Sequence, residues 1–465
     1  MATSRIYRTQ DAGDRTQWTW SGWIKPSPSD GTTYGMTVFC AYKAADNYTE
    51  LAFQNSGAID YLNVTNGSTD ARLTTNRKFR DCGAWMHVVA VWDSDNASAG
   101  DRMKLYVNGE EITDFSADTN PSSGLESIMN KSTHDVEIGS RAAGANFFRG
   151  VMCHVNFVNA AALAPTAFGE TDTDGMWKIK TSPSVTYGTN GYFLKMEDST
   201  NLDLDSSSNA YTFTSAGELT YTKDTASNNF CQLSPIAGNY SSGTGLSNDA
   251  GLQFVGTQGN AWRAVYATLC FNSGKYYYEV KINTVSTNNQ YNFGFTSVEN
   301  IVNGALIDTI GSAGVGAAAG IRQDGDIKYA TESAASQTSV GWGSTFTAGD
   351  IVSCAIDCDN NFVYFGVNGT WMNSGNPASG ATGTGGFAID NATKPMWSAI
   401  IACNETASGS TNYLGCNFGA GTFPAVSGAP VTVTSEGTNA SGNGIFEYDV
   451  PTGYGAICTK QINGD

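Results

Sequence analysis

Asn-Gly turns at the ends of alternating segments constrain the fold of this chain more than any other sequence feature. Residues 351–357 follow a two-residue alternation, and the aromatic, β-branched segment after them ends at Asn368–Gly369. A similar segment at 104–107 ends at Asn108–Gly109. Both residue types tolerate a positive φ angle, so the backbone can reverse there within two residues. Because alternation before such a turn is typical of β-hairpins, we expect antiparallel strands in both halves of the chain.

The composition favours an all-β protein. The 465 residues include 53 Gly, 10 Trp, 21 Tyr and 22 Phe, whereas only 15% of them are charged. Glycine-rich turns between aromatic strands are typical of β-sandwiches, and no window has the long apolar period of a helix. The length allows two or three domains with their own cores. The prediction is two antiparallel β-sandwich (jelly-roll) domains in tandem, followed by a short β tail.

The strand pattern predicts the order of the segments. We expect a jelly roll at 1–190, a connecting strand, loop and hairpin at 191–227, a second β-sandwich at 228–425 and a C-terminal β tail at 426–465. Within the connection, 211–213 and 219–221 have the pattern of a hairpin. Two placements stay open for the tail, which can pack back on the second sandwich or reach a neighbouring subunit.

The charge and the cysteines limit the partners and the compartment. The net charge of −18 comes from 43 acidic and 25 basic residues, which argues against binding a nucleic-acid backbone. No apolar run has membrane-spanning length, and no apolar signal core stands at the N-terminus, so we expect neither secretion nor anchoring by a standard route. The ten cysteines form no Cys-x-x-Cys pair. We expect buried thiols in a reducing compartment, with a disulfide framework as the alternative.

The second half of the chain resembles the SPRY (B30.2-like) domain. The resemblance rests on the hairpin that starts at Gly349-Asp350 and ends at Asn368-Gly369, and on flanking motifs. These motifs are Trp262-Arg263-Ala264, the segment 274–280, Phe293-Gly294-Phe295 and the segment 396–400. The similarity covers roughly residues 228–425 and implies a second sandwich there.

The first half resembles the concanavalin A-like, laminin-G-type jelly roll. The motifs that carry the resemblance are the segment 20–23, Trp85-Met86-His87, the segment 104–109, Glu137-Ile138-Gly139 and Phe148-Arg149-Gly150. The two-module layout looks like that of marine and other bacteriophage virion proteins, in which similar jelly rolls are followed by segments such as 168–170, Trp177 and 187–194. One departure is that the usual opening strand is missing. The first sandwich is therefore expected to have an unpaired edge or to borrow a strand from a neighbour.

Few residues have the arrangement that catalysis would need. His87, His134 and His154 stand apart, so a zinc site is unsupported, and His87 is expected to be a core or rim histidine. Glycan hydrolases need paired carboxylates on one strand face, but the Glu-x-Asp-x-x-Glu spacing is absent. Glu197 and Asp198 are adjacent, so they would point to opposite faces of a strand. We therefore expect no enzymatic activity and keep a glycan hydrolase as an alternative.

No cofactor is expected. Calcium prefers clustered oxygen ligands, and the candidate loops are Asp93–Asn96, Asp203–Asp205 and Asp357–Asn361. None of these loops completes a calcium-binding consensus, so solvated turn carboxylates are the expectation.

Aromatic side chains on loops are the candidates for binding. Loops at the ends of a sandwich carry most binding surfaces. Trp177, Tyr187 and Tyr240 lie in polar, irregular stretches. The lectin-like resemblance implies that exposed rings there would stack on glycans.

The two-module resemblance implies a non-enzymatic protein of the bacteriophage surface, either a capsid decoration or head-fibre protein or another exterior appendage. The implied partners are other virion proteins and host-surface glycans, in a homo-oligomer or a symmetric multi-copy assembly. Neither nucleic acid nor an inserted membrane is an expected partner. The chain would be made in the host cytoplasm and end on the virion exterior. The alternatives are a tail-fibre protein that recognises host polysaccharide and a glycan hydrolase.

Overall fold

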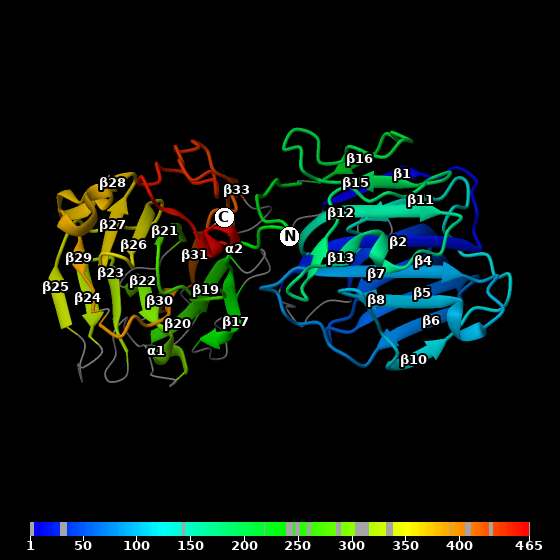
Figure 1. Cartoon of the computed structure of the whole chain (residues 1–465), viewed down its shortest axis with the longest axis horizontal. Helices are drawn as coiled ribbons and strands as arrows, with labels where there is room; N and C mark the ends of the chain where they lie inside the picture. Colours follow the sequence, from blue (N-terminus) through cyan, green and yellow to red (C-terminus); the bar gives the residue numbers. More distant parts are fainter. Residues whose placement is uncertain are drawn as a thin grey trace. The chain divides into compact units, whose positions relative to one another are not determined.

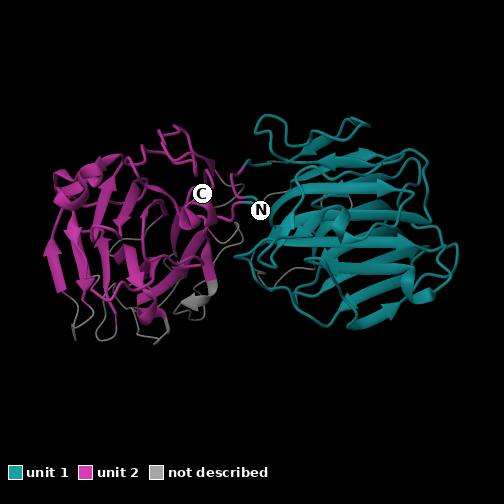
Figure 2. Cartoon of the chain, viewed as in Figure 1, with its two compact units in different colours: residues 1–221, 225–227 teal, residues 222–224, 228–465 magenta. Residues whose placement is uncertain are grey.

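The computed structural model describes residues 4–27, 35–141, 145–217, 219–238, 245–246, 252–257, 262–284, 290–302, 316–331, 338–390, 392–404, 411–426 and 431–464. The chain divides into two compact units (Figure 2), Met1–Tyr221 with Thr225–Ser227, and Thr222–Asp224 with Asn228–Asp465. Each unit is built on two large, mainly antiparallel sheets (Figure 1), which confirms the predicted all-β class.

The first unit has a sheet of eight strands, β10-β6-β5-β4-β3-β11-β1-β16, and a sheet of six, β15-β12-β2-β7-β8-β9. Their bounds are β1 (Arg5–Thr9), β2 (Gln17–Pro26), β3 (Met36–Ala44), β4 (Asn47–Phe53), β5 (Ile59–Thr65), β6 (Ser68–Thr75), β7 (Met86–Asp93), β8 (Met103–Val107), β9 (Glu110–Glu111), β10 (Phe115–Thr119), β11 (Asp135–Ile138), β12 (Gly150–Asn159), β15 (Tyr192–Leu194) and β16 (Thr214–Ala216). A separate short hairpin consists of β13 (Gly169–Thr171) and β14 (Trp177–Ile179).

Large aromatic side chains fill the space between these two sheets. Trp18 and Trp20 alternate along β2 and are fully buried. Trp18 stacks on Trp92 of β7 with ring centroids 6.3 Å apart, and Tyr61 of the opposite sheet meets it edge-on at 6.0 Å. Because aromatic rings bury large apolar areas, these contacts dominate the core of the unit.

The N-terminal segment corrects the expectation of a missing opening strand. Strand β1 pairs with β11 through Ile6 and Ile138, and with β16 through Ile6 and Ser215. Ile6 is buried in the core, which explains why a segment without the usual opening pattern still forms a strand. The edge expected to be unpaired is therefore occupied from within the chain.

The hairpin expected at 211–213 and 219–221 is wrong. Among the described residues of this segment, 214–216 form β16, which pairs with β1 instead of with a neighbour in the segment. Phe213 enters the core of the first unit and meets Tyr192 edge-on at 5.0 Å. Burial of this ring, rather than local pairing, sets the path of the chain.

The second unit has a seven-stranded sheet, β17-β20-β30-β22-β23-β24-β25, and a nine-stranded sheet with the path β18-β19-β31-β21-β26-β27-β28, in which β29 pairs with β27 and β34 with β21. The bounds are β17 (Leu233–Gly238), β18 (Gly245–Leu246), β19 (Gln253–Thr257), β20 (Trp262–Ala267), β21 (Lys275–Thr284), β22 (Gln290–Ser297), β23 (Ala318–Arg322), β24 (Asp326–Ala330), β25 (Thr338–Gly341), β26 (Ile351–Asp357), β27 (Phe362–Val367), β28 (Thr370–Trp371), β29 (Phe387–Ala388), β30 (Trp397–Asn404), β31 (Thr411–Asn417) and β34 (Gly455–Ala456). Strands β32 (Thr422–Phe423) and β33 (Val431–Thr432) form a separate pair.

The structure contains the β-hairpin that the alternation at 351–357 predicted. Strands β26 and β27 pair antiparallel from Val352–Val367 to Asp357–Phe362. Asp357 is fully buried and accepts the backbone N–H groups of Asp359 and Asn360 in the turn. Its other oxygen lies 2.7 Å from Lys275 Nζ on β21, so the turn is fixed to the neighbouring strand.

The C-terminal segment packs back on its own sandwich, which was one of its two predicted placements. Phe446, Tyr454 and Cys458 cover Tyr277 and Tyr364 on the outer face of the nine-stranded sheet. Among the described residues of the tail, the β structure consists of two-residue strands, and one short helix follows them. Strand β34 pairs with β21, and buried aromatic side chains such as Phe446 and Tyr454 attach the rest of the segment to the sheet.

The helices are short. Helix α1 is Val298–Val302 and α2 is Thr459–Asn463, and 3-10 turns lie at Ala99–Asp101, Pro165–Ala167, Met372–Ser374 and Pro377–Thr382. Within the described ranges, no helix has the length and apolar character needed to cross a membrane.

All ten cysteines are thiols, and all except Cys270 are buried. Cys354 and Cys416, for example, lie in the main core of the second unit. Burial raises the pKa of Cys231 to about 11, which disfavours its thiolate. The cysteines therefore act as small apolar side chains, as the sequence predicted.

Candidate functional site

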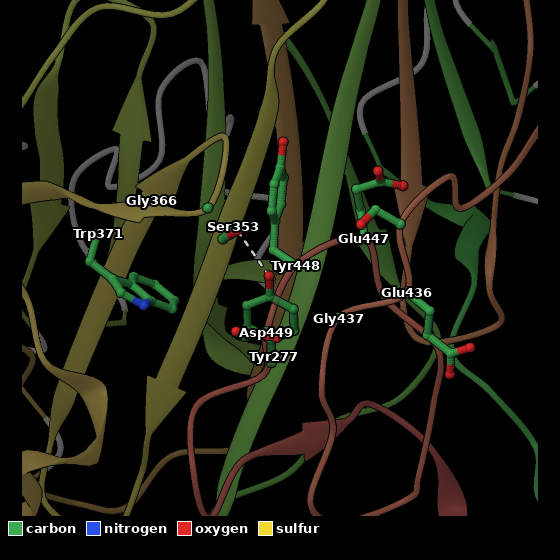
Figure 3. A pocket seen from close by; sticks show the side chains of 11 residues that line it. Tyr277, Ser353, Gly366, Trp371, Glu436, Gly437, Glu447, Tyr448 and Asp449 are labelled. Atoms are coloured by element: carbon green, nitrogen blue, oxygen red, sulfur yellow. Dashed lines mark hydrogen bonds between the residues drawn. The ribbon is translucent and has the colours of Figure 1, made fainter.

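A pocket lies on the outer face of the nine-stranded sheet of the second unit, beside the C-terminal segment. It has a volume of about 430 Å³. The lining residues, drawn in Figure 3, come from the sheet and from the C-terminal segment: Tyr277, Ser353, Gly366, Gly369, Trp371, Ser435, Glu436, Gly437, Glu447, Tyr448 and Asp449. This volume is in the range of pockets that bind small molecules.

The floor of the pocket is built from small residues in one row across the sheet. Ser353 of β26 stands opposite Gly366 of β27, and Gly366 stands opposite Trp371 of β28. A Cβ atom at Gly366 would lie 3.1 Å from the carbonyl oxygen of Thr370 and 3.4 Å from Cε3 of Trp371. The missing side chain at Gly366 therefore keeps the space beside the Trp371 ring open.

A buried carboxylate holds one wall in place. Glu279 of β21 is fully buried, and its two oxygens accept the backbone N–H groups of Glu447 and Tyr448, each at 2.9 Å. The Tyr277 hydroxyl donates to the same carboxylate at 2.9 Å and lies 2.9 Å from the Ser353 hydroxyl. Burial raises the pKa of Glu279 to about 7, and these donors limit the rise. Glu279 thus connects the floor to the C-terminal wall.

Two half-buried aromatic side chains face the hollow. In Figure 3, Trp371 lies to the left and Tyr448 in the middle, with Gly366 and Ser353 between them. Gly369 has a φ of +78°, and a Cβ atom there would lie 2.7 Å from Cδ1 of Tyr448. The Asn-Gly turn thus provides both the reversal of the chain and the space for the Tyr448 ring.

Carboxylates form the rim. Glu447 accepts the backbone N–H of Thr434 at 2.7 Å and also its hydroxyl. Asp449 accepts the backbone N–H of Thr438 at 2.7 Å and its hydroxyl at 2.8 Å, and these bonds lower the pKa of Asp449. Glu436 is exposed. Because the donors are neutral, the rim keeps its negative charge.

Nearby negative charge also affects the pKa of Tyr448 in the wall. Burial raises the pKa of Tyr448, and the negative charges of Glu447, Glu279 and Asp350 raise it further. The site is chemically suited to hydrogen bonding, to stacking on a ring and to attracting a cation.

Neither of the two sequence candidates that the structure describes, Trp177 and Tyr187, lines this pocket. Tyr187 is only 7% exposed, and its hydroxyl donates to Asn156 at 2.9 Å, so its expected exposure is wrong. The sequence around Tyr187 does not separate the two cases, because a buried, hydrogen-bonded tyrosine and an exposed tyrosine both occur in polar stretches. Trp177 is half-buried in the first unit, where it stacks on His87. Tyr240 lies outside the described residues.

His87 is a core histidine, as predicted, and it is placed between Ser21 and Trp177. The Trp177 indole N–H donates to Nδ1 of His87 at 3.1 Å, so in the neutral ring Nε2 carries the proton. Nε2 lies 2.8 Å from the Ser21 hydroxyl oxygen and therefore donates to it. Burial lowers the pKa of His87 to about 3. This histidine does not act as a base toward Ser21, so the three residues form a structural contact.

Two buried carboxylates face outward from the eight-stranded sheet of the first unit. Glu50 and Glu137 both stand opposite Cys40, one on each neighbouring strand, so their Cα atoms are about 9.5 Å apart by strand spacing. Glu50 is 3.1 Å from Arg141 and Glu137 is 2.8 Å from Arg5. Burial raises the pKa of Glu50, and Arg141 opposes the rise. Each carboxylate is thus neutralised by its own arginine.

The turn carboxylates proposed for calcium are occupied by protein donors. Asp205 accepts the backbone N–H groups of Phe193, Ser207 and Tyr211 and is buried, so its expected solvation is wrong. Asp95 accepts the Thr16 hydroxyl. Among the described residues, no three His, Cys, Asp or Glu side chains are grouped to hold a metal ion.

Comparison with known families identifies the fold of the first unit. A laminin-G-type family model, described as the concanavalin A-like lectin/glucanases superfamily, matches residues 4–166. The first unit therefore contains a concanavalin A-like jelly-roll domain, which confirms this part of the resemblance. That superfamily includes both glycan hydrolases and proteins that bind without catalysis. No curated protein matches the sequence.

Three solved structures are similar to parts of the chain. A native heptameric SAP-like pentraxin from Limulus polyphemus is 17% identical, with 35% of this chain and 72% of that chain covered and a TM-score of 0.27. The SPRY domain of human HERC1 is 13% identical, with 40% and 96% covered and a TM-score of 0.29. Domain 4 of the arabinanase AbnA from Geobacillus stearothermophilus, in complex with arabinotriose, is 18% identical, with 34% and 68% covered and a TM-score of 0.25. Scores this low support no inference about function.

Proposed function

We propose that this chain is a non-enzymatic binding protein that holds a saccharide in the pocket of its second unit. The observation that carries the proposal is the combination of two half-buried aromatic rings, Trp371 and Tyr448, with a small floor and a carboxylate rim. Sugar rings offer apolar C–H faces that pack on aromatic rings and hydroxyl groups that donate to carboxylates. One ligand would thus use both features.

A saccharide array tests this proposal. The full chain and a Trp371→Ala variant would be applied to immobilised saccharides, with Trp342→Ala as the matched control. Trp342 is also half-buried in the second unit, but it packs on Phe387 at 5.4 Å and does not line the pocket. We expect W371A to lose the binding that W342A retains. Equal binding by wild type and W371A would contradict a saccharide site at this pocket.

The two-module resemblance supports a place on the exterior of a bacteriophage particle. In this proposal the chain is a capsid decoration or head-fibre protein, or another exterior appendage, that contacts other virion proteins in a symmetric multi-copy assembly. The tail-fibre alternative assigns the same pocket to recognition of host polysaccharide. Mass spectrometry and antibody-gold imaging of purified particles separate the two, because label on the head supports decoration and label at the tail tip supports host recognition. Absence from intact particles would contradict both.

A glycan hydrolase remains the second candidate, because Glu50 and Glu137 share one sheet face. Glycan hydrolases use two carboxyl groups that flank the scissile bond, and these two side chains stand on the two strands that flank β3. However, each carboxylate is paired with an arginine, whereas a general acid must hold a proton. We expect no release of reducing sugar from host polysaccharide. Release that is lost in Glu50→Gln would overturn the non-enzymatic proposal.

A further inference from the structure

We infer that the pocket selects a saccharide unit bearing a protonated amino group. This inference rests on the proposed function and deepens it, because it names the class of sugar. The structural basis is uncompensated negative charge around an aromatic cavity. Glu436, Glu447 and Asp449 all line the pocket, and within the described part of the chain no lysine or arginine side chain lines it.

The rim carboxylates are fixed in place without being neutralised. Glu447 and Asp449 bind the N–H and hydroxyl groups of Thr434 and Thr438, which orient the two side chains but carry no charge. Glu50, Glu137 and Asp357, by contrast, each have an arginine or lysine partner. The rim therefore retains a negative potential that an ammonium group would satisfy.

The aromatic side chains of the walls also favour a ligand that carries an ammonium group. An ammonium group near the face of a tryptophan or tyrosine ring is attracted by the ring quadrupole. Trp371 and Tyr448 both line the cavity, so an amino sugar between them would place its ring on apolar faces and its ammonium group near the rim. The same charges repel uronic acids, sialic acids and sugar phosphates, which gives the site discrimination against acidic saccharides.

The rim argues for a sugar rather than a lone lysine side chain. The hydroxyls of Ser353 and Tyr277 at the base of the pocket are buried and bond to each other, and Tyr277 also donates to Glu279. The polar groups left for a ligand are the rim carboxylates, on which a saccharide unit can place hydroxyl groups as well as its ammonium group, whereas a lysine side chain presents one ammonium group. A lysine side chain of a partner protein is therefore the competing occupant that the experiment must separate.

The test uses two trisaccharides that differ only in their amino groups. Titration calorimetry of the full chain at pH 6 and low salt would compare the glucosamine trimer with the fully N-acetylated trimer. We expect the glucosamine trimer to bind about tenfold more tightly, as several partly exposed charge pairs would provide. Glu436→Gln should reduce this preference about threefold by removing one pair. Glu110→Gln, an exposed carboxylate on β9 of the first unit, is the charge-matched control and should change nothing.

The outcomes separate the inference from the proposed function. Equal affinity for both trimers, lost in W371A, would overturn the amino-group inference and leave saccharide binding intact. A preference that stays at about tenfold in both E436Q and W371A would place the site elsewhere and overturn the inference. Displacement of the glucosamine trimer by free lysine at equal concentration would also overturn it, because the site would then recognise any ammonium group. If neither trimer binds, the inference fails, and array binding of other saccharides decides whether the proposed function fails with it.

Discussion

The attachment of the pocket wall to Glu279 predicts a pH-dependent stability that one substitution removes. Glu279 is fully buried and accepts the N–H groups of Glu447 and Tyr448. Its pKa is raised from an ordinary value of 4.5 to about 7, first by burial. Because the folded state holds the proton more tightly than the unfolded state, stability falls as pH rises from 4.5 to about 7.

The size of the effect follows from the linkage. At about 1.4 kcal/mol for each pKa unit, the full rise corresponds to about 3 kcal/mol, most of which is lost between pH 5 and pH 8. Glu279→Gln has no titrating group at this position. The free energy of unfolding of the second unit should therefore fall by about 2 to 3 kcal/mol more in the wild type than in E279Q over this range.

Hydrogen–deuterium exchange of peptides that span β21, measured as a function of urea, reports the unfolding of the second unit separately from the first. Comparing both proteins at each pH cancels the intrinsic exchange rates and the titration of other groups. Glu436→Gln, which removes an exposed carboxylate of the same unit, should follow the wild-type profile. Parallel profiles of wild type and E279Q would refute the assignment of a raised pKa to this buried carboxylate.

Three further predictions concern other parts of the structure. Burial lowers the pKa of His87 to about 3, so the neutral ring stabilises the first unit fully above pH 6.5, and this stabilisation is lost as the pH falls toward 3. In urea unfolding the wild type should lose about 3 kcal/mol by pH 4, and His87→Phe should lack this loss. An equal loss in both proteins would contradict the burial argument. Arg141→Ala leaves the Glu50 carboxylate buried without its arginine partner and should destabilise the first unit by about 2 kcal/mol in thermal unfolding. Adding Glu50→Gln to this variant should restore most of the lost stability. Unchanged stability in R141A would show that the ion pair does not stabilise the fold. Gly366→Ala places a methyl group on the pocket floor, where it takes up space that the ligand would fill, and should weaken saccharide binding about threefold to tenfold. Unchanged affinity would show that Gly366 is not part of the site.

Much of the fold followed from local sequence patterns. The alternation at 351–357 and the turn at Asn368–Gly369 predicted β26 and β27 with their bounds, because period and turn chemistry agree there. Strand β1 was missed because Ile6 is a single buried apolar residue in a polar segment, and its two partner strands are distant in the sequence. The sequence did not show how little of the tail is strand, because buried aromatic side chains such as Phe446 hold it and aromatic residues are also typical of strands.

The pocket could not be predicted from the sequence. Its floor comes from β26 and β27 and its wall from residues 435–449, and only the packing of the C-terminal segment brings them together. One signal was available, since Glu279 is a lone acid in the aromatic and apolar strand β21. A carboxylate at such a position must find donors when it is buried. Its donors, the N–H groups of Glu447 and Tyr448, carry no mark in the sequence because every residue except proline has one.

The most direct test of the account is to observe which tryptophan a saccharide touches. The chain has ten tryptophans, and 5-fluorotryptophan labelling gives each a fluorine resonance, with that of Trp371 assigned from a Trp371→Phe variant. The saccharide that gives the strongest signal on the array would be titrated into the labelled full chain. We expect the Trp371 resonance to shift with saturation. A saturating shift of other tryptophans with Trp371 unchanged would contradict it and place the binding site elsewhere in the chain.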